Sequence, residues 1–257
     1  MRGDVPDTCL AQVFLKAHHE RRCCTVTDSE RAEIAGLAVR WQSQPHEADR
    51  AVQGAEPVFG LWVLADPDAT IDAMTQEEFE QTDERMPYFA MVWASADSLV
   101  ARVLAGPRLD GIRVLDLGCG LGACGLAAAA RGAQVTFFDW EPRALEIVRA
   151  SATRQPVPSA EFVFQVGDWR SPPPMEPFDL ILGADVLYEQ RNAPAVAAFL
   201  AGHLKPGAEA WIGDPGRPQA GPFPALAEAH GLQVVSSEIM PPRPHGTEIR
   251  LLRVRRP

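Results

Sequence analysis

The sequence predicts an α/β protein whose core is a doubly wound sheet of seven strands, mostly parallel, with an antiparallel C-terminal hairpin and an N-terminal helical extension. From residue 112 onward, apolar runs alternate with stretches of helical pattern, which is typical of a parallel sheet wound with helices. The last two apolar runs follow each other without a helix, so they are expected to pair antiparallel.

The expected strands cover residues 112–117, 134–139, 161–166, 178–184, 209–213, 232–240 and 249–255. The expected helices cover residues 124–131, 142–155, 193–204 and 222–230. Together these elements form a unit over residues 111–257.

The first 53 residues are expected to form the helical extension. Its second helix is indicated by the capping sequence Thr27-Asp28-Ser29-Glu30, followed at helical spacing by Ile34, Leu37, Ala38 and Trp41. Residues 54–110 form the next unit, a strand/helix segment that packs on the core. It opens with an apolar run at 58–64 that predicts a strand.

The charge balance limits the classes of partner. The 257 residues carry a formal net charge of -10 at pH 7. This argues against sequence-independent binding of nucleic acid, because neutralising phosphates requires a basic surface. The chain contains no apolar run of roughly 18 residues and no secretion signal, so we expect a soluble, cytoplasmic protein without membrane contact.

Cysteine and histidine residues give no metal motif, and no metal is expected. The cysteines lack the paired Cys-x-x-Cys spacing of a zinc site, and the six histidines show no ligand spacing. Cys119 and Cys124 are interpreted as small packing residues rather than nucleophiles.

A glycine-rich loop is the strongest functional signal. The segment VLDLGCGLGACG at 114–125 is a buried strand that ends in Gly118, Gly120 and Gly122 and leads at once into a helix. Glycines let the backbone approach a ligand, and a helix start offers free N–H groups, so a nucleotide-like cofactor is implied. The loop also matches the dinucleotide fingerprint, with Asp139 at the required distance.

Acidic residues at the strand ends favour S-adenosylmethionine over a dinucleotide. Asp116 precedes the first glycine, where its carboxylate can bind the amine of the methionine end but would repel a pyrophosphate. Asp139 ends the second strand and can accept both ribose hydroxyls, or it can cap the following helix. Asp168 and Trp169 follow the third strand where an adenine would lie. Trp140 and Trp169 are candidate neighbours of the adenosine.

Several motifs resemble one family. The order of DLGCGLG, FFDW and GDW resembles the class I (seven-β-strand) S-adenosylmethionine-dependent methyltransferases, which have a Rossmann-like fold. The stretch FDLILGADVLY at 178–188, with its Asp-x-x-Tyr ending, and PYFAMVW at 87–93 resemble the family 16 protein-lysine methyltransferases. PYFAMVW and WIGDPGRPQ at 211–219 are most similar to the electron transfer flavoprotein β-subunit lysine methyltransferases.

The resemblance implies methyl transfer to a protein lysine, with the electron transfer flavoprotein β-subunit as the implied partner. Asp185 is expected to orient the amine, because a carboxylate at the end of the fourth strand points into the crevice beside the cofactor; the alternative is a helix cap or a structural acid. Tyr188 is expected to wall the lysine channel, or simply to pack. Trp93 is expected to cover the cofactor or line the substrate cleft, within a segment of 54–110 that closes over the cofactor. The family's Trp-Pro is here Trp93-Ala94.

The corner WIGDPGRPQ carries two further candidates. Asp214 and Arg217 are expected to shape the substrate entrance, or to form a mutual ion pair that locks the turn. Two other functions remain open at this point. One is an N-methyltransferase for a small molecule or another side chain, and the other is a non-catalytic module that binds the cofactor.

Overall fold

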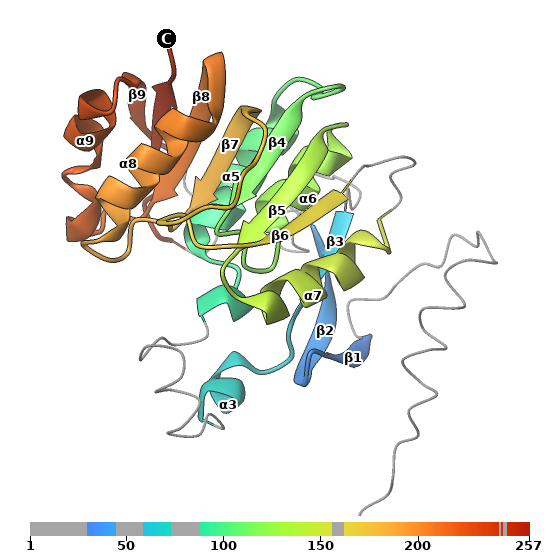
Figure 1. The fold of residues 1–257 in the computed structure, drawn as a ribbon. Helices are drawn as coiled ribbons and strands as arrows, with labels where there is room; N and C mark the ends of the chain where they lie inside the picture. Colours follow the sequence, from blue (N-terminus) through green and yellow to red (C-terminus); the bar gives the residue numbers. More distant parts are fainter. Residues whose placement is uncertain (1–29, 45–58, 73–87, 156–161, 242, 244–245) are drawn as a thin grey trace, which may run out of the picture.

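The computed structural model describes residues 30–44, 59–72, 88–155, 162–241, 243 and 246–257. Its main feature is a seven-stranded sheet with the strand order β6-β5-β4-β7-β8-β10-β9 (Figure 1). The strands are β4 (Arg113–Leu117), β5 (Gln134–Asp139), β6 (Phe162–Val166), β7 (Phe178–Ala184), β8 (Leu204–Asp214), β9 (Gln233–Ile239) and β10 (Arg250–Arg255). Strands β4 to β8 are parallel, and β10 is antiparallel to β8 and β9. The predicted sheet and its terminal hairpin are confirmed.

Two hydrophobic clusters, one on each face of the sheet, form the core. One contains side chains of α5 (Ala94–Ala105), α6 (Ala123–Ala130) and α7 (Pro142–Ala152), and the other those of α8 (Asn192–His203) and α9 (Phe223–Ala229). Successive residues of β7 alternate between them, with Leu180 and Leu182 in the first cluster and Ile181 in the second, because side chains of a strand point to opposite faces. The chain leaves β4 toward β5 and β6 on one side and reaches β7 and β8 on the other. Ligands bind open α/β sheets at such a switch point.

The described part of the N-terminal region is a small sheet, so the expected helix there is wrong. β1 (Arg31–Ile34), β2 (Leu37–Gln44) and β3 (Phe59–Leu64) pair antiparallel in that order. Ala35 and Gly36 connect β1 to β2 with φ angles of 55° and 74°, as a two-residue hairpin turn requires. Burial in β2 follows a period of two, with Val39 and Trp41 inside. The rest of the expected extension, residues 1–29 and 45–53, lies outside the described residues.

The small sheet docks on α7 through the free edge of β3. Gln155 donates to the carbonyl oxygen of Gly60 at 2.6 Å and accepts from the Gly60 N–H at 3.2 Å. The Trp62 N–H donates to the Ser151 hydroxyl at 2.9 Å. Arg154 completes the contact with an ion pair to Glu30 and ring contacts to two tryptophans. Side chains of α7 and of the turn that follows it therefore satisfy an edge that would otherwise expose backbone groups.

Gln155→Ala is expected to loosen this docking. It removes both partners of Gly60, and loss of such hydrogen bonds costs about 1–2 kcal/mol. The expected result is a lower denaturation midpoint and faster hydrogen exchange at the Gly60 amide. Thr153→Ala, at the same end of α7 but facing solvent, is the matched control. Equal exchange at Gly60 in both variants would contradict the role given to Gln155.

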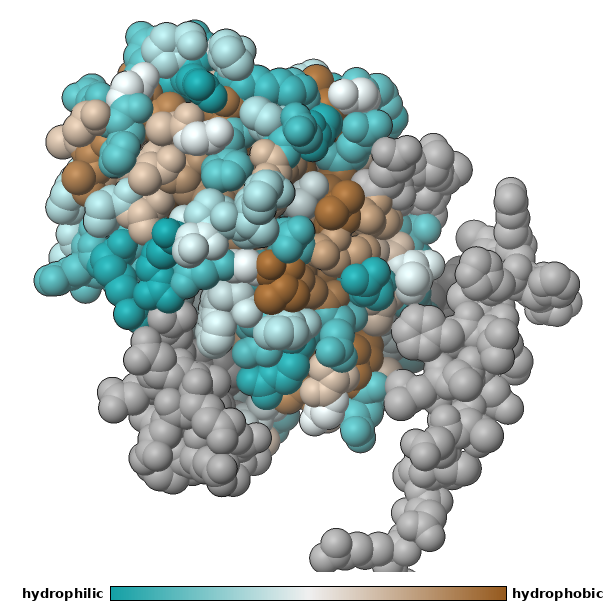
Figure 2. Space-filling model, viewed as in Figure 1, coloured by the Kyte–Doolittle hydropathy of each residue, from teal (hydrophilic) through white to brown (hydrophobic). Residues whose placement is uncertain are grey.

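The surface of the viewed face mixes hydrophilic and hydrophobic residues (Figure 2). Hydrophobic side chains gather over the region of β6 and α7, where the edge strand β6 leaves Val163 53% and Val166 47% exposed. In the part of the chain that the structure describes, none of the helices has the length and apolar character needed to cross a bilayer.

Candidate active site

A cleft lies at the carboxyl ends of β4, β5 and β7. It encloses about 1110 Å³, including its open mouth. Among the predicted site residues, the cleft is lined by Trp93, Asp116, Gly118, Gly120, Asp139, Trp140, Trp169, Asp185, Tyr188 and Arg217. Three predicted residues, Gly122, Asp168 and Asp214, do not line it. Most of the predicted site therefore comes together in one place.

The glycine loop forms the floor of the cleft because side chains are excluded there. Gly118 and Gly120 have φ angles of 61° and 49°. A Cβ atom on Gly118 would lie 2.9 Å from the ring of Trp169, and one on Gly120 would lie 3.0 Å from the carbonyl oxygen of Phe89. Gly122 instead caps α6 with a φ of 77°, and its missing side chain leaves room for Val148 in the core.

Asp116 is a buried carboxyl group next to this floor. It is 2% exposed, and its Oδ2 accepts a hydrogen bond from the Gly125 N–H at 2.8 Å. Burial raises the pKa of Asp116 to about 8, against the lowering effect of that hydrogen bond. A cation placed beside it would favour the ionised form.

Asp139 ends β5 and ties the glycine loop to the next helix. Its Oδ2 accepts from the Gly120 N–H at 2.9 Å and its Oδ1 from the Glu141 N–H at 3.0 Å. Burial raises the pKa of Asp139 to about 6. The alternative role as a helix cap is wrong, because the side chain of Glu141 caps α7 by accepting from the Arg143 N–H. Each carboxylate oxygen keeps a further lone pair for a ligand hydroxyl.

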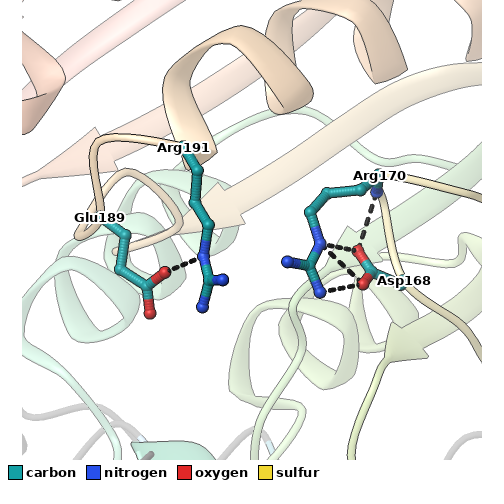
Figure 3. A network of polar contacts seen from close by, with 4 residues as sticks. All are labelled: Asp168, Arg170, Glu189 and Arg191. Atoms are coloured by element: carbon teal, nitrogen blue, oxygen red, sulfur yellow. Dashed lines mark hydrogen bonds and ion pairs between the residues drawn. The ribbon is translucent and has the colours of Figure 1, made fainter. Parts of the chain in front are cut away.

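Asp168 lies on a smaller neighbouring cavity, and Arg170 binds its carboxylate (Figure 3). A second pair, Glu189 with Arg191, comes from the loop between β7 and α8, and in this view the two guanidinium groups lie between the two carboxylates. This cavity shares Trp140, Trp169 and Tyr188 with the main cleft. Trp169 therefore lines both cavities, whereas Asp168 lines only the smaller one.

Asp185 stands directly after β7 in an unusual backbone conformation. Its φ is 57°, a value that few non-glycine residues adopt and that costs about 1–3 kcal/mol. Its N–H donates to the carbonyl oxygen of Gly213 on β8 at 2.9 Å, which holds this conformation. The carboxylate is 6% exposed and forms an ion pair with Arg217 at 2.8 Å. Strain of this kind is typical of functional positions.

In the turn after β8, Asp214 and Arg217 do not form the ion pair that was one of the two expectations for them. Asp214 is 2% exposed, and its Oδ1 accepts from the backbone N–H groups of Gly216 and Arg217 at 2.7 Å and 2.8 Å. The guanidinium of Arg217 binds Asp185 instead. Asp214 is thus a turn residue, and Arg217 is the member of the pair that lines the cleft.

Aromatic rings form the wall of the cleft near Asp185. The ring of Tyr88 lies 5.8 Å from that of Trp93 and 5.7 Å from that of Tyr188. The indole N–H of Trp93 donates to the Tyr88 carbonyl oxygen at 2.8 Å. Tyr88, Phe89 and Met91 were not predicted as individual site residues, although the PYFAMVW segment that contains them was singled out.

The missing proline after Trp93 does not disturb this wall. Trp93 is the N-cap of α5, and Ala94 is its first residue. Proline is tolerated at that position without being required, because the N–H there has no partner within the helix. Alanine therefore allows the same helix start.

The two cysteines of the loop are buried packing residues, as the sequence indicates. Burial raises the pKa of both thiols, Cys119 and Cys124, well above the ordinary value. Nucleophilic thiols need a lowered pKa, so this environment suits neither for catalysis.

The cleft fits S-adenosylmethionine by its own chemistry. Two buried carboxyl groups, Asp116 and Asp139, stand at adjacent strand ends, and a glycine floor lets a ligand approach the backbone. Among the described lining residues, Arg217 is the sole basic side chain, and it is bound to Asp185. This arrangement suits a cofactor with a positively charged amine and ribose hydroxyls better than one with a pyrophosphate.

Comparison with known proteins agrees with this chemistry. Residues 114–207 match the family model described as "Methyltransferase domain". The protein N-lysine methyltransferase METTL21A of Danio rerio is 36% identical over 130 residues, covering 48% of this chain and 59% of that protein. The electron transfer flavoprotein beta subunit lysine methyltransferase of Xenopus laevis is 33% identical over 143 residues, covering 54% and 57%. The chain thus spans less than two thirds of the curated relatives it matches.

A solved structure supports the fold. The magnesium protoporphyrin IX methyltransferase ChlM from Synechocystis PCC 6803 with bound SAM superimposes with a TM-score of 0.54 and 22% identity, over 75% of this chain and 90% of that chain. At this level of identity the likeness concerns the fold alone. Residues 114–207 therefore belong to a methyltransferase domain with the class I, seven-stranded fold, and S-adenosylmethionine is its cofactor.

Proposed function

We propose that this protein transfers a methyl group from S-adenosylmethionine to the ε-amine of a lysine in a protein partner. The observation that carries the proposal is Asp185, a buried carboxylate beside the cofactor cleft and already paired with a cationic side chain. A lysine ammonium has the charge and the hydrogen-bond donors to take that place.

A bound lysine must be oriented and must lose a proton. Its pKa of about 10.4 means that exposing the lone pair at pH 7 costs roughly 4.6 kcal/mol. S-adenosylmethionine, when bound, supplies an electrophilic methyl group on a positively charged sulfur. Asp185 holds the nitrogen by a charge-assisted hydrogen bond and so serves to position it. The rings of Tyr88, Trp93 and Tyr188 wall the approach and limit the access of water.

The relatives support a protein substrate. METTL21A and the flavoprotein β-subunit enzyme are both named as lysine methyltransferases, and the matched part of the chain reaches about a third identity to each. We propose the β-subunit of electron transfer flavoprotein as the first partner to test. The net charge of -10 favours a partner with a basic surface around the lysine.

The testing experiment uses tritiated S-adenosylmethionine with the full chain. The protein is incubated with purified electron transfer flavoprotein β-subunit and, separately, with cell lysate, and labelled bands are analysed by mass spectrometry. We expect label on a lysine of the β-subunit.

Other outcomes separate the alternatives. Label on lysine of a different protein would keep the reaction and replace the partner. Label confined to the small-molecule fraction would replace lysine methylation by small-molecule methylation. Binding of S-adenosylhomocysteine without transfer to any fraction would indicate a non-catalytic module. Ligand binding is followed independently by the rise in melting temperature.

A further inference from the structure

Arg217 occupies the position that a cationic substrate would take. Its Nε and one terminal nitrogen each lie 2.8 Å from Oδ1 of Asp185. Its guanidinium carbon lies 5.8 Å from the centre of the Trp93 ring, within the range of a cation–π contact. A buried carboxylate and an aromatic face are two features that bind an ammonium group. In this structure the side chain of Arg217 contacts both.

The two partners differ in their access to water. The Arg217 side chain is 32% exposed, whereas that of Asp185 is 6% exposed. If Arg217 moves away, it can be hydrated, but Asp185 is left as an unpaired buried charge until another cation arrives. Exchange of one cation for another is therefore favoured over simple opening.

The backbone from which Arg217 projects does not need to move in this exchange. The Asp214 carboxylate accepts hydrogen bonds from the N–H groups of Gly216 and Arg217, so the backbone of the turn is fixed. A long side chain with several rotatable bonds can leave Asp185 while its own N–H stays bonded. The exchange is thus a side-chain rearrangement.

We propose that Arg217 is an internal stand-in for the substrate ammonium, and that the incoming lysine must displace it from Asp185. The proposal rests on the proposed function for the identity of the cation, but it concerns binding and not transfer. Arg217 keeps the buried charge neutralised in the free protein and competes with the substrate. It is a specificity-determining residue, because a ligand without a positive charge cannot take its place at Asp185.

The test measures binding of n-butylammonium to the full chain saturated with S-adenosylhomocysteine. Removal of the competing guanidinium in Arg217→Gln is expected to tighten the Kd of n-butylammonium about tenfold. Arg108→Gln removes the same charge from an exposed surface pair and is expected to leave the Kd unchanged. n-Butanol, which has a similar shape and no charge, is expected to show no gain in Arg217→Gln. Equal Kd values for n-butylammonium in wild type and Arg217→Gln would overturn the proposal.

A second measurement uses the wild-type protein and so does not depend on the folding of a variant. The Nε–H signal of Arg217 in the ¹⁵N-labelled chain is followed by nuclear magnetic resonance while n-butylammonium is added. We expect the signal to move to the position of a hydrated arginine and its exchange with water to accelerate. If n-butylammonium binds and the signal stays in place, Arg217 is not displaced and the proposal fails. Neither measurement involves methyl transfer, so a failure of lysine methylation leaves both results interpretable.

Discussion

Asp185→Asn is expected to reduce methyl transfer to the proposed lysine substrate by about 10²–10³-fold while leaving the affinity for S-adenosylhomocysteine nearly unchanged. Loss of a positioning charge weakens both the binding and the orientation of the ammonium, and effects of this size are typical of such groups. The carboxylate of Asp185 is bound to Arg217 and not to the glycine loop. The cofactor part of the cleft should therefore survive the substitution. Transfer is measured with tritiated cofactor, and affinity by calorimetry.

Asp214→Asn is the matched control for this prediction. Asp214 is also a buried acid at the end of a neighbouring strand, but it accepts two backbone hydrogen bonds through one oxygen. An asparagine oxygen can accept the same bonds, so transfer should remain close to the wild-type rate. If both variants lost transfer equally, Asp185 would have no special role. If Asp185→Asn kept full transfer, the assignment of the site would be wrong.

The acids at the strand ends could be predicted from the sequence because their positions follow from local pattern. Asp116 and Asp139 stand where an apolar run meets glycines or a helix start, and parallel strands bring such ends to one edge. The pair between Asp185 and Arg217 could not be predicted in this way. The two residues are 32 positions apart, and sequence proximity favoured Asp214 as the partner.

In the N-terminal hairpin, a local sequence pattern predicted the wrong secondary structure. The residues from Ile34 to Trp41 fit helical spacing, and a capping sequence precedes them. In the structure, burial in β2 follows a period of two instead, because the strand pairs with β3 and because Arg154, in the turn after α7, packs on the ring of Trp41. Partners distant in the chain outweighed the local preference. The turn at Ala35 and Gly36 was the available signal for a hairpin.

Asp116→Asn is expected to stabilise the cofactor-free protein and to weaken cofactor binding. The pKa of Asp116 is about 8 in the folded protein and near 3.9 in an unfolded chain. At pH values between these two pKa values, the folded state binds more protons than the unfolded state. The free energy of unfolding therefore falls as the pH rises toward 8. An asparagine has no proton to lose, so the variant should gain stability relative to wild type from pH 5 to pH 8. The expected gain in the free energy of unfolding is on the order of 4 kcal/mol.

The expected loss of affinity for the cofactor also follows from the ionisation of Asp116. The positive methionine end of the cofactor favours the ionised form of Asp116, so binding at pH 7 should release close to one proton and tighten as pH rises toward 8. Asparagine offers no charge, and we expect affinity to fall about ten- to a hundredfold and the proton release to decrease. Calorimetry in buffers of different ionisation enthalpy measures both quantities, and thermal unfolding across pH measures stability. A variant that bound the cofactor as tightly as wild type, with unchanged proton release, would show that Asp116 does not contact the cofactor amine.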